Sequence, residues 1–278
     1  MSISRKDFLK RSLQGVLMIG MGNSLQALGS AYKLPPGSEI KLRFAVASDG
    51  HYGQHDTEYE FHHDNMVEWL NKDYQERGID FTMINGDLFH DDVQFLAQSK
   101  EKWNDLQMPY YVSHGNHDMT DEATWKDTWN RPFNYSFEFG DCGFLVLNTA
   151  SDAGAYICPD IAWTGAQLGL LGKKKHLFIF MHITPFKWTS GGINCPEITS
   201  MFAKQKNLRA IFHGHDHDQD NVKQSDKKLY FFDSHVAGNW GTDYYGYRIV
   251  EILENGNILT YQMNAARQHK VNHDKIPV

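Results

Sequence analysis

Short apolar runs alternate with longer amphipathic stretches through the first part of the chain. Leu42–Ala47, Phe81–Ile84 and Tyr110–Val112 are apolar, and each run predicts a buried strand. Apolar residues recur at helical spacing between Glu58 and Arg77, which predicts a helix there. Because apolar runs that alternate with helices are typical of a parallel sheet covered by helices, the pattern predicts an α/β fold.

The pattern becomes richer in strands after Trp129. Tyr135–Phe139 alternates in polarity, a Gly-Asp turn follows, and Phe144–Leu147 is apolar, which predicts an antiparallel hairpin. Because the sequence contains no internal repeat, we expect a single domain over residues 41–278. The remaining predicted elements are helices near 93–106, 166–171 and 198–204 and strands at 177–181, 208–212, 229–232, 245–252 and 258–263.

The N-terminal segment has the layout of an export signal. Residues 4–10, with the sequence SRKDFLK, resemble a twin-arginine motif in which Lys6 replaces the second arginine. The apolar stretch Leu13–Leu28 is too short and too polar for a comfortable membrane span, and small residues follow it. We therefore expect an export signal at 1–31, recognised by export machinery, a linker at 32–40, and a periplasmic or secreted protein. The alternative is an amphipathic N-terminal helix.

The charge of the chain limits its partners. The formal net charge is −7, and residues 1–31 hold four basic residues against one Asp, so the rest of the chain carries −10. An acidic chain binds nucleic acid and anionic membranes poorly, because both need a positive surface. Hydrophobic residues make up 41% of the chain, enough for a packed core. No segment beyond the N-terminal one approaches the length of a membrane span.

The three cysteines match no zinc motif. Cys142 begins an apolar run, as a buried thiol does, whereas Cys158 and Cys195 each precede a proline in a loop. The two loop cysteines could pair in an oxidising compartment, but the sequence alone leaves a disulfide and free thiols equally open.

Polar motifs follow the predicted strands at five places. They are Ser48-Asp49-Gly50-His51, Asn85-Gly86-Asp87, Gly115-Asn116-His117-Asp118, Met181-His182 and His213-Gly214-His215-Asp216-His217. The carboxyl ends of parallel strands are where polar groups converge in open α/β folds, so we expect these side chains to meet.

The residue types in these motifs fit a pair of metal ions. Asp49 and His51 are two residues apart, so their side chains can point the same way on an extended strand end, and the same holds for His215 and His217. The central carboxylate Asp87 can bridge two ions, and such a pair can clamp a phosphoryl group. Because imidazole and carboxylate ligands are mixed, manganese, iron or zinc is favoured over magnesium or calcium.

The order of the motifs resembles that of the calcineurin-like metallophosphoesterases, over roughly Leu42 to Met263. The resemblance implies a four-layer α/β/β/α sandwich in which helices flank two mixed sheets. It also implies two divalent metal ions that share one carboxylate. The implied ligands are Asp49, His51, Asp87 and His217 for one ion, and Asp87, Asn116, His182 and His215 for the other.

The same resemblance assigns further roles near the metals. His117 would contact the phosphate and protonate the leaving oxygen, and Asp118 would orient His117 by a hydrogen bond. His90 and His235 lie near the motifs and could contact substrate, with a structural role as the alternative. Purple acid phosphatases carry a tyrosine where this chain has His90, so an iron-tyrosinate centre is not expected.

We weigh three functions. The leading one is an exported hydrolase that cleaves small phosphomonoesters or phosphodiesters. A nuclease is the first alternative, because Gly86-Asp87-Leu88-Phe89-His90 resembles a motif of recombination-repair exonucleases, although the negative charge opposes it. A metal-binding scaffold without activity is the second. Each residue alone has an ordinary explanation, such as a helix cap for Asp49, a turn for Asn116 or a buried core position for His182.

Overall fold

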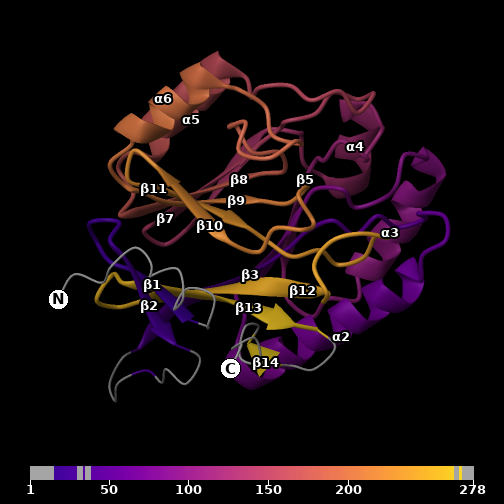
Figure 1. The fold of residues 1–278 in the computed structure, drawn as a ribbon, viewed down its shortest axis with the longest axis horizontal. Coiled ribbons are helices and arrows are strands. Elements are labelled where there is room, and N and C mark those ends of the chain that lie inside the picture. The colour runs from indigo at the N-terminus through magenta and orange to yellow at the C-terminus, as the bar shows by residue number, and fades with distance from the viewer. Residues whose placement is uncertain (1–15, 30–33, 35–38, 266–268, 271–278) are drawn as a thin grey trace.

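The protein folds into two mixed β-sheets flanked by helices, as seen in a computed structural model that describes residues 16–29, 34, 39–265 and 269–270 (Figure 1). The larger sheet has the order β2-β1-β13-β12-β3-β4-β5, with β14 also paired to β13. Its strands are β1 (Val16–Ile19), β2 (Leu25–Gly29), β3 (Ile40–Ala47), β4 (Phe81–Asn85), β5 (Tyr110–Ser113), β12 (Gly246–Leu253), β13 (Ile258–Asn264) and β14 (His269–Lys270).

The smaller sheet has the order β10-β11-β9-β8-β7-β6. Its strands are β6 (Tyr135–Phe139), β7 (Cys142–Leu147), β8 (His176–Met181), β9 (Leu208–His213), β10 (Val222–Ser225) and β11 (Lys228–Phe232). Strands β3, β4 and β5 are mutually parallel, and so are β7, β8, β9 and β11. The predicted α/β fold and the four-layer arrangement are therefore confirmed.

Helices cover the outer face of each sheet. On the larger sheet lie α2 (Tyr59–Arg77), the 3₁₀ turn η1 (Val93–Phe95), α3 (Leu96–Trp103) and α4 (Glu122–Trp129). On the smaller sheet lie α5 (Ile161–Leu171) and α6 (Pro196–Lys204), as Figure 1 shows at the top of the view. Helix α2 ends where Gly78 adopts a φ of 73°, a conformation that favours glycine.

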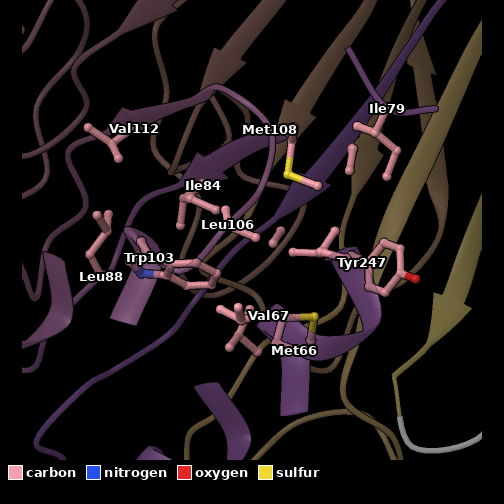
Figure 2. Close-up of a cluster of buried hydrophobic side chains, with 14 of the residues drawn as sticks. Met66, Val67, Ile79, Ile84, Leu88, Trp103, Leu106, Met108, Val112 and Tyr247 are labelled. Atoms are coloured by element: carbon pink, nitrogen blue, oxygen red, sulfur yellow. The ribbon is translucent and has the colours of Figure 1, made fainter. Parts of the chain in front are cut away.

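Three apolar clusters join the four layers. Between the sheets, the ring of Phe44 stacks on Phe81 at 5.1 Å and meets Phe144 edge-on at 5.5 Å. Under the helices of the larger sheet, Met66 from α2 and Trp103 from α3 are completely buried (Figure 2). A third cluster lies between the smaller sheet and α5 and α6. Burial of apolar surface stabilises the folded state by about 25 cal/mol per Å². The packing of these clusters therefore fixes the two sheets, and with them the ends of their strands, relative to one another.

The sequence patterns missed helix α4 and strands β1, β2, β10 and β14, and they predicted one helix too long. Helix α4 has too few turns for a clear period, although Asp121 caps it by accepting from the Thr124 N–H at 2.9 Å. Strand β10 is a polar edge strand without an apolar run. The predicted helix at 93–106 begins as the 3₁₀ turn and ends at Trp103.

Part of the predicted export segment lies in the larger sheet. Strand β1 pairs antiparallel with β13, and Val16 is 1% exposed. The Asn23 side chain donates to the Leu208 carbonyl at 2.8 Å. The predicted twin-arginine-like motif lies outside the described residues. The predicted cleavage region is described only in part, because Ala27 and Gly29 lie in β2 and residues 30–31 are not described, so export stays a prediction.

Cys158 and Cys195 form a disulfide, with their Cα atoms 5.7 Å apart, and Cys142 is a buried free thiol. The bridge joins the loop before α5 to the loop before α6.

We expect the double variant Cys158→Ser with Cys195→Ser to lose up to about 4 kcal/mol of unfolding free energy, because 37 residues separate the two cysteines and their cross-link restricts the unfolded chain. Urea unfolding of native and variant protein measures this loss. Equal midpoints would contradict the expectation, and Cys142→Ser controls for loss of a thiol.

Candidate metal centre

Every predicted metal ligand lies at the carboxyl end of a parallel strand or in the loop that follows it. On the larger sheet, Asp49 and His51 follow β3, Asp87 follows β4, and Asn116 follows β5. On the smaller sheet, His182 directly follows β8, and His215 and His217 follow β9. Both sheets thus contribute ligands to one site.

Hydrogen bonds between the sheets hold these strand ends together. The Asn85 side chain, at the end of β4, donates to the Phe212 carbonyl of β9 at 3.1 Å. Across the same junction, the His215 N–H donates to Asp49 Oδ1 at 3.0 Å. The two halves of the site are therefore joined through buried polar groups and not through apolar packing alone.

The backbone at the ligands is strained. Asp49, His51, Asp87 and His215 have φ values of 60°, 45°, 54° and 67°, which are uncommon for residues other than glycine. Gly214 relieves crowding beside them, because a Cβ there would contact Ser48 Oγ and lie 2.6 Å from Asp49 Oδ2. Such strain persists only where the surrounding structure enforces it, and it concentrates at functional sites.

Six of the predicted ligands fall into two adjoining groups, each with ligand atoms within 4.8 Å of one another, and His51, His90 and His117 form a third group within the same limit. The first contains Asp49, His51 and His217, with His217 Nε2 3.2 Å from Asp49 Oδ1. The second contains Asp87, His182 and His215, with His182 Nε2 3.0 Å from Asp87 Oδ2. Asp87 Oδ2 also lies 3.6 Å from His51 Nε2 in the first group, so this carboxylate stands between the two groups as a bridge would.

These residues fit a pair of metal ions. Asn116 Oδ1 is buried and has no hydrogen-bond partner, which is costly unless a cation binds there. His182 Nδ1 lies 2.8 Å from the Asn85 carbonyl, and His217 Nδ1 lies 3.1 Å from the Trp240 carbonyl. Carbonyl partners of this kind orient metal-binding imidazoles and leave Nε2 free to bind.

Buried charges shift the pKa values of the ligands in opposite directions. Burial alone would lower the pKa of His182, but the Asp87 and Asp49 carboxylates raise it to about 10. Burial also opposes the ionisation of Asp49 and Asp87, yet the neighbouring imidazoles lower the pKa of each. Burial lowers the pKa of His215 to about 4, so this ring is neutral at pH 7. Without metal, protonated imidazoles compensate the carboxylates.

Metal binding should therefore release protons at neutral pH. His182 carries a proton at pH 7 because its pKa is about 10, and it must lose that proton to bind a cation through Nε2. We expect about one proton from His182, with tighter metal binding as the pH rises toward 10. Zinc titration calorimetry at pH 7.5 in two buffers of different ionisation enthalpy measures the release. Identical heats in both buffers would contradict it.

The same raised pKa affects the metal-free fold. Protonated His182 contributes to the free energy of unfolding of the metal-free protein. This contribution is fully present below pH 6.5, the ordinary pKa of histidine, and is lost as the pH rises through about 10.

His117 lies beside the two groups, but its hydrogen-bond partner differs from the prediction. His117 Nδ1 is 2.7 Å from Asp91 Oδ1. Asp118 is buried and accepts from the backbone N–H groups of Leu88, Phe89 and Gly115, so its carboxylate shapes the loop and does not contact the His117 ring. Asp91 thus takes the orienting position expected for Asp118. The acidic Asp91 directly after His90 was the available signal in the sequence.

The two predicted substrate contacts have different outcomes. His90 is 22% exposed at the edge of the site, and its Nδ1 is 3.0 Å from His51 Nδ1. His235 is 2% exposed, packs behind the ring of His217 at 4.9 Å, and has its Nδ1 2.6 Å from the Ala237 carbonyl. This burial corrects the expectation of a substrate contact, because His235 supports His217 from behind. His213 is buried and belongs to none of the groups of possible metal ligands.

Two half-exposed aromatic rings lie against the ligands. The Trp240 ring is parallel to that of His217 at 4.4 Å and is 50% exposed, and the Tyr156 ring meets His215 edge-on at 5.0 Å and is 44% exposed. Tyr156 belongs to the disulfide-bonded loop and had no motif to reveal it. Apolar groups of a substrate could pack against either ring.

Comparison with known proteins supports this picture of the fold. The family model for calcineurin-like phosphoesterases matches residues 42–219. No curated protein sequence matches the chain. Among solved structures, a dimetal phosphatase from Danio rerio is 12% identical, with a TM-score of 0.62, and the alignment covers 77% of this chain and 96% of that one.

Two further structures share the fold. GAP50, described as the anchor in the inner membrane complex of Plasmodium, is 14% identical with a TM-score of 0.63, over 85% of this chain and 90% of that one. A purple acid phosphatase from yellow lupin is 13% identical with a TM-score of 0.62, over 86% of this chain and 54% of that one. At these identities the likeness concerns the fold alone.

Proposed function

The chain belongs to the calcineurin-like phosphoesterase family and is a hydrolase of phosphoric esters, and we propose that it is an exported enzyme that uses two metal ions to cleave small phosphodiesters. The observation that carries the proposal is the pair of adjoining ligand groups with Asp87 between them. Two cations in these groups would lie close enough to act on one phosphoryl group.

The roles of the residues follow from their positions. When bound, the ions polarise the phosphoryl oxygens and activate water. Asp49, His51 and His217 would hold one ion, while His182, His215 and the buried Asn116 oxygen would hold the other. His117, at the rim of the site, donates a proton to the leaving oxygen, and Asp91 holds its Nδ1 side. The imidazole ligands favour manganese, iron or zinc.

The charges around the site favour diesters over monoesters. Burial has the largest effect on the pKa values of Asp49, Asp87, His182 and His217, and the charged groups with the next largest effects are histidines and aspartates. A phosphodiester carries one negative charge and a monoester dianion two, so the diester needs less compensation beyond the metals. The second ester group could pack on Trp240 or Tyr156.

A substrate screen tests this function. Protein reconstituted separately with manganese, iron or zinc is incubated with phosphodiesters, phosphomonoesters and pyrophosphate, and product is measured. We expect turnover with at least one of these metals and a higher kcat/KM for diesters. Cleavage of none of the substrates would favour the scaffold, a role in line with the description of GAP50 as an anchor. Turnover supported only by magnesium would contradict the assigned imidazole ligands.

Export is a separate part of the proposal. The twin-arginine-like sequence supports it, and the Cys158–Cys195 disulfide fits an oxidising compartment. No helix in the described residues is long and apolar enough to cross a membrane. Cell fractionation followed by N-terminal sequencing of the recovered protein tests it. We expect a periplasmic or secreted chain that begins near residue 32, and a cytosolic chain that begins at Met1 would contradict export.

A further inference from the structure

A pair of ring nitrogens at the edge of the metal centre carries an unassigned hydrogen bond. His51 Nδ1 lies 3.0 Å from His90 Nδ1, with the two ring planes inclined at 65°. A contact of this length between two imidazole nitrogens requires one donor and one acceptor. The position of the single proton in this contact is therefore a chemical property of the site.

The direction in which His51 faces decides where that proton lies. His51 Nε2 is 2.9 Å from His217 Nε2 and 3.6 Å from Asp87 Oδ2, so it points into the first ligand group. A cation in that group takes the lone pair of Nε2. Neutral His51 then carries its hydrogen on Nδ1, and this N–H must donate to His90. His90 must in turn offer an unprotonated Nδ1.

His51 differs from its neighbours in this respect. The Nδ1 atoms of His182 and His217 face the backbone carbonyls of Asn85 and Trp240. A carbonyl oxygen is always an acceptor, so Nδ1 of each of these two rings must be the donor in its hydrogen bond. An imidazole can donate or accept, so the metal-binding form of His51 depends on the form that His90 adopts.

The backbone holds His90 at the required place. Its N–H donates to the Tyr52 carbonyl at 3.0 Å, and the next N–H, of Asp91, donates to the His117 carbonyl at 2.8 Å. The other ring nitrogen, His90 Nε2, faces Asp91 Oδ2 at 3.7 Å, and the second oxygen of the same carboxylate contacts His117. A carboxylate near Nε2 favours a hydrogen on that nitrogen and leaves Nδ1 free to accept.

We propose that His90 is a positioning residue for the metal ligand His51. With its hydrogen on Nε2, the neutral His90 ring accepts from His51 Nδ1–H and keeps His51 Nε2 ready to bind a cation. The proposal rests on the dinuclear centre of the proposed function. In this arrangement, contacts through His90 and Asp91 connect His51 of the first ligand group to His117.

Three substitutions separate this role from a merely structural one. His90→Asn places a side-chain oxygen near the Nδ1 position, whereas the longer side chain of His90→Gln reaches toward the Nε2 position, and His90→Ala removes both. Zinc binding is measured by competition with a chelator. We expect the Ala and Gln variants to bind one of the two zinc ions about 10- to 100-fold more weakly than native protein does. Asn should restore affinity to within about threefold of native, since its oxygen can accept the same bond.

The controls make each outcome decisive. His55→Ala removes an imidazole that is 92% exposed in a nearby loop, and it should bind zinc like native protein. If His90→Ala binds both zinc ions as tightly as native protein, or if Asn is no better than Ala, the inference fails while the proposed function stands. If native protein binds no pair of zinc ions, the proposed function fails as well.

A measurement on the native protein avoids any effect of substitution on folding. Two-bond ¹H–¹⁵N spectra of the zinc-loaded protein report which ring nitrogen carries hydrogen. We expect His51 with hydrogen on Nδ1 and His90 with hydrogen on Nε2 alone. A His90 ring that is doubly protonated, or that carries its hydrogen on Nδ1, would overturn the inference.

Discussion

Replacing Asp87 with Asn should lower the rate of phosphoester hydrolysis by at least about 10³-fold. Asp87 Oδ2 lies 3.0 Å from His182 Nε2 and 3.6 Å from His51 Nε2, so this carboxylate contributes to both ligand groups. Its other oxygen accepts from the His117 N–H at 2.8 Å. An amide keeps that acceptor and the shape of the side chain but removes the negative charge that two cations would share.

The measurement has two parts. The metal content of purified Asp87→Asn is determined at equilibrium with zinc, and kcat/KM is determined with the best substrate of the screen. We expect fewer than two bound ions together with the loss of activity. Asp92→Asn is the matched control, because Asp92 is an exposed cap of η1 whose Oδ1 accepts from the Gln94 N–H, and it should retain metal and activity. Full activity of Asp87→Asn would contradict a bridging role.

Replacing His117 with Ala should slow hydrolysis by about 10²- to 10⁴-fold for esters with a poor leaving group. His117 is 32% exposed at the rim of the site, and its Nδ1 is held by Asp91. An alkoxide must be protonated as it leaves, whereas nitrophenolate leaves without a proton. The loss should therefore be much smaller for nitrophenyl esters than for alkyl esters.

The dependence on the leaving group separates acid catalysis from general damage. Rates of native and variant protein are compared across a series of aryl and alkyl diesters, and thermal unfolding checks the fold. A steeper dependence on leaving-group pKa in His117→Ala is the expected result. An equal loss for all esters would contradict a proton donor. Asp91→Asn should show the same trend with a smaller loss, about tenfold, since it acts only by orienting His117.

The sequence predicted the core of the site because the ligands have a simple relation to the strands. Apolar runs such as Leu42–Ala47 and Leu208–Phe212 form buried parallel strands, and polar residues directly after them must emerge at the carboxyl edge of a sheet. The order of the motifs then distinguished Asp87, between the two ligand groups, from a common turn aspartate.

Residues placed by loops were harder to predict. Asp118 follows His117 in the chain, yet its carboxylate turns inward to three backbone N–H groups, and Asp91 from another loop contacts His117. His235 is close to the site in space but is buried behind His217. Sequence spacing does not report which way a loop side chain points, because that depends on hydrogen bonds to distant segments.

The sequence by itself predicted the family, the candidate metal ligands and the strands that carry them, since local polarity and chain order specify which side chains leave the sheet edges. Only the tertiary structure decided how Asp91, His90 and His117 are connected, that Tyr156 and Trp240 flank the ligands, and that Cys158 reaches Cys195. These relations join loops far apart in the chain, and packing between the two sheets sets the distances between those loops.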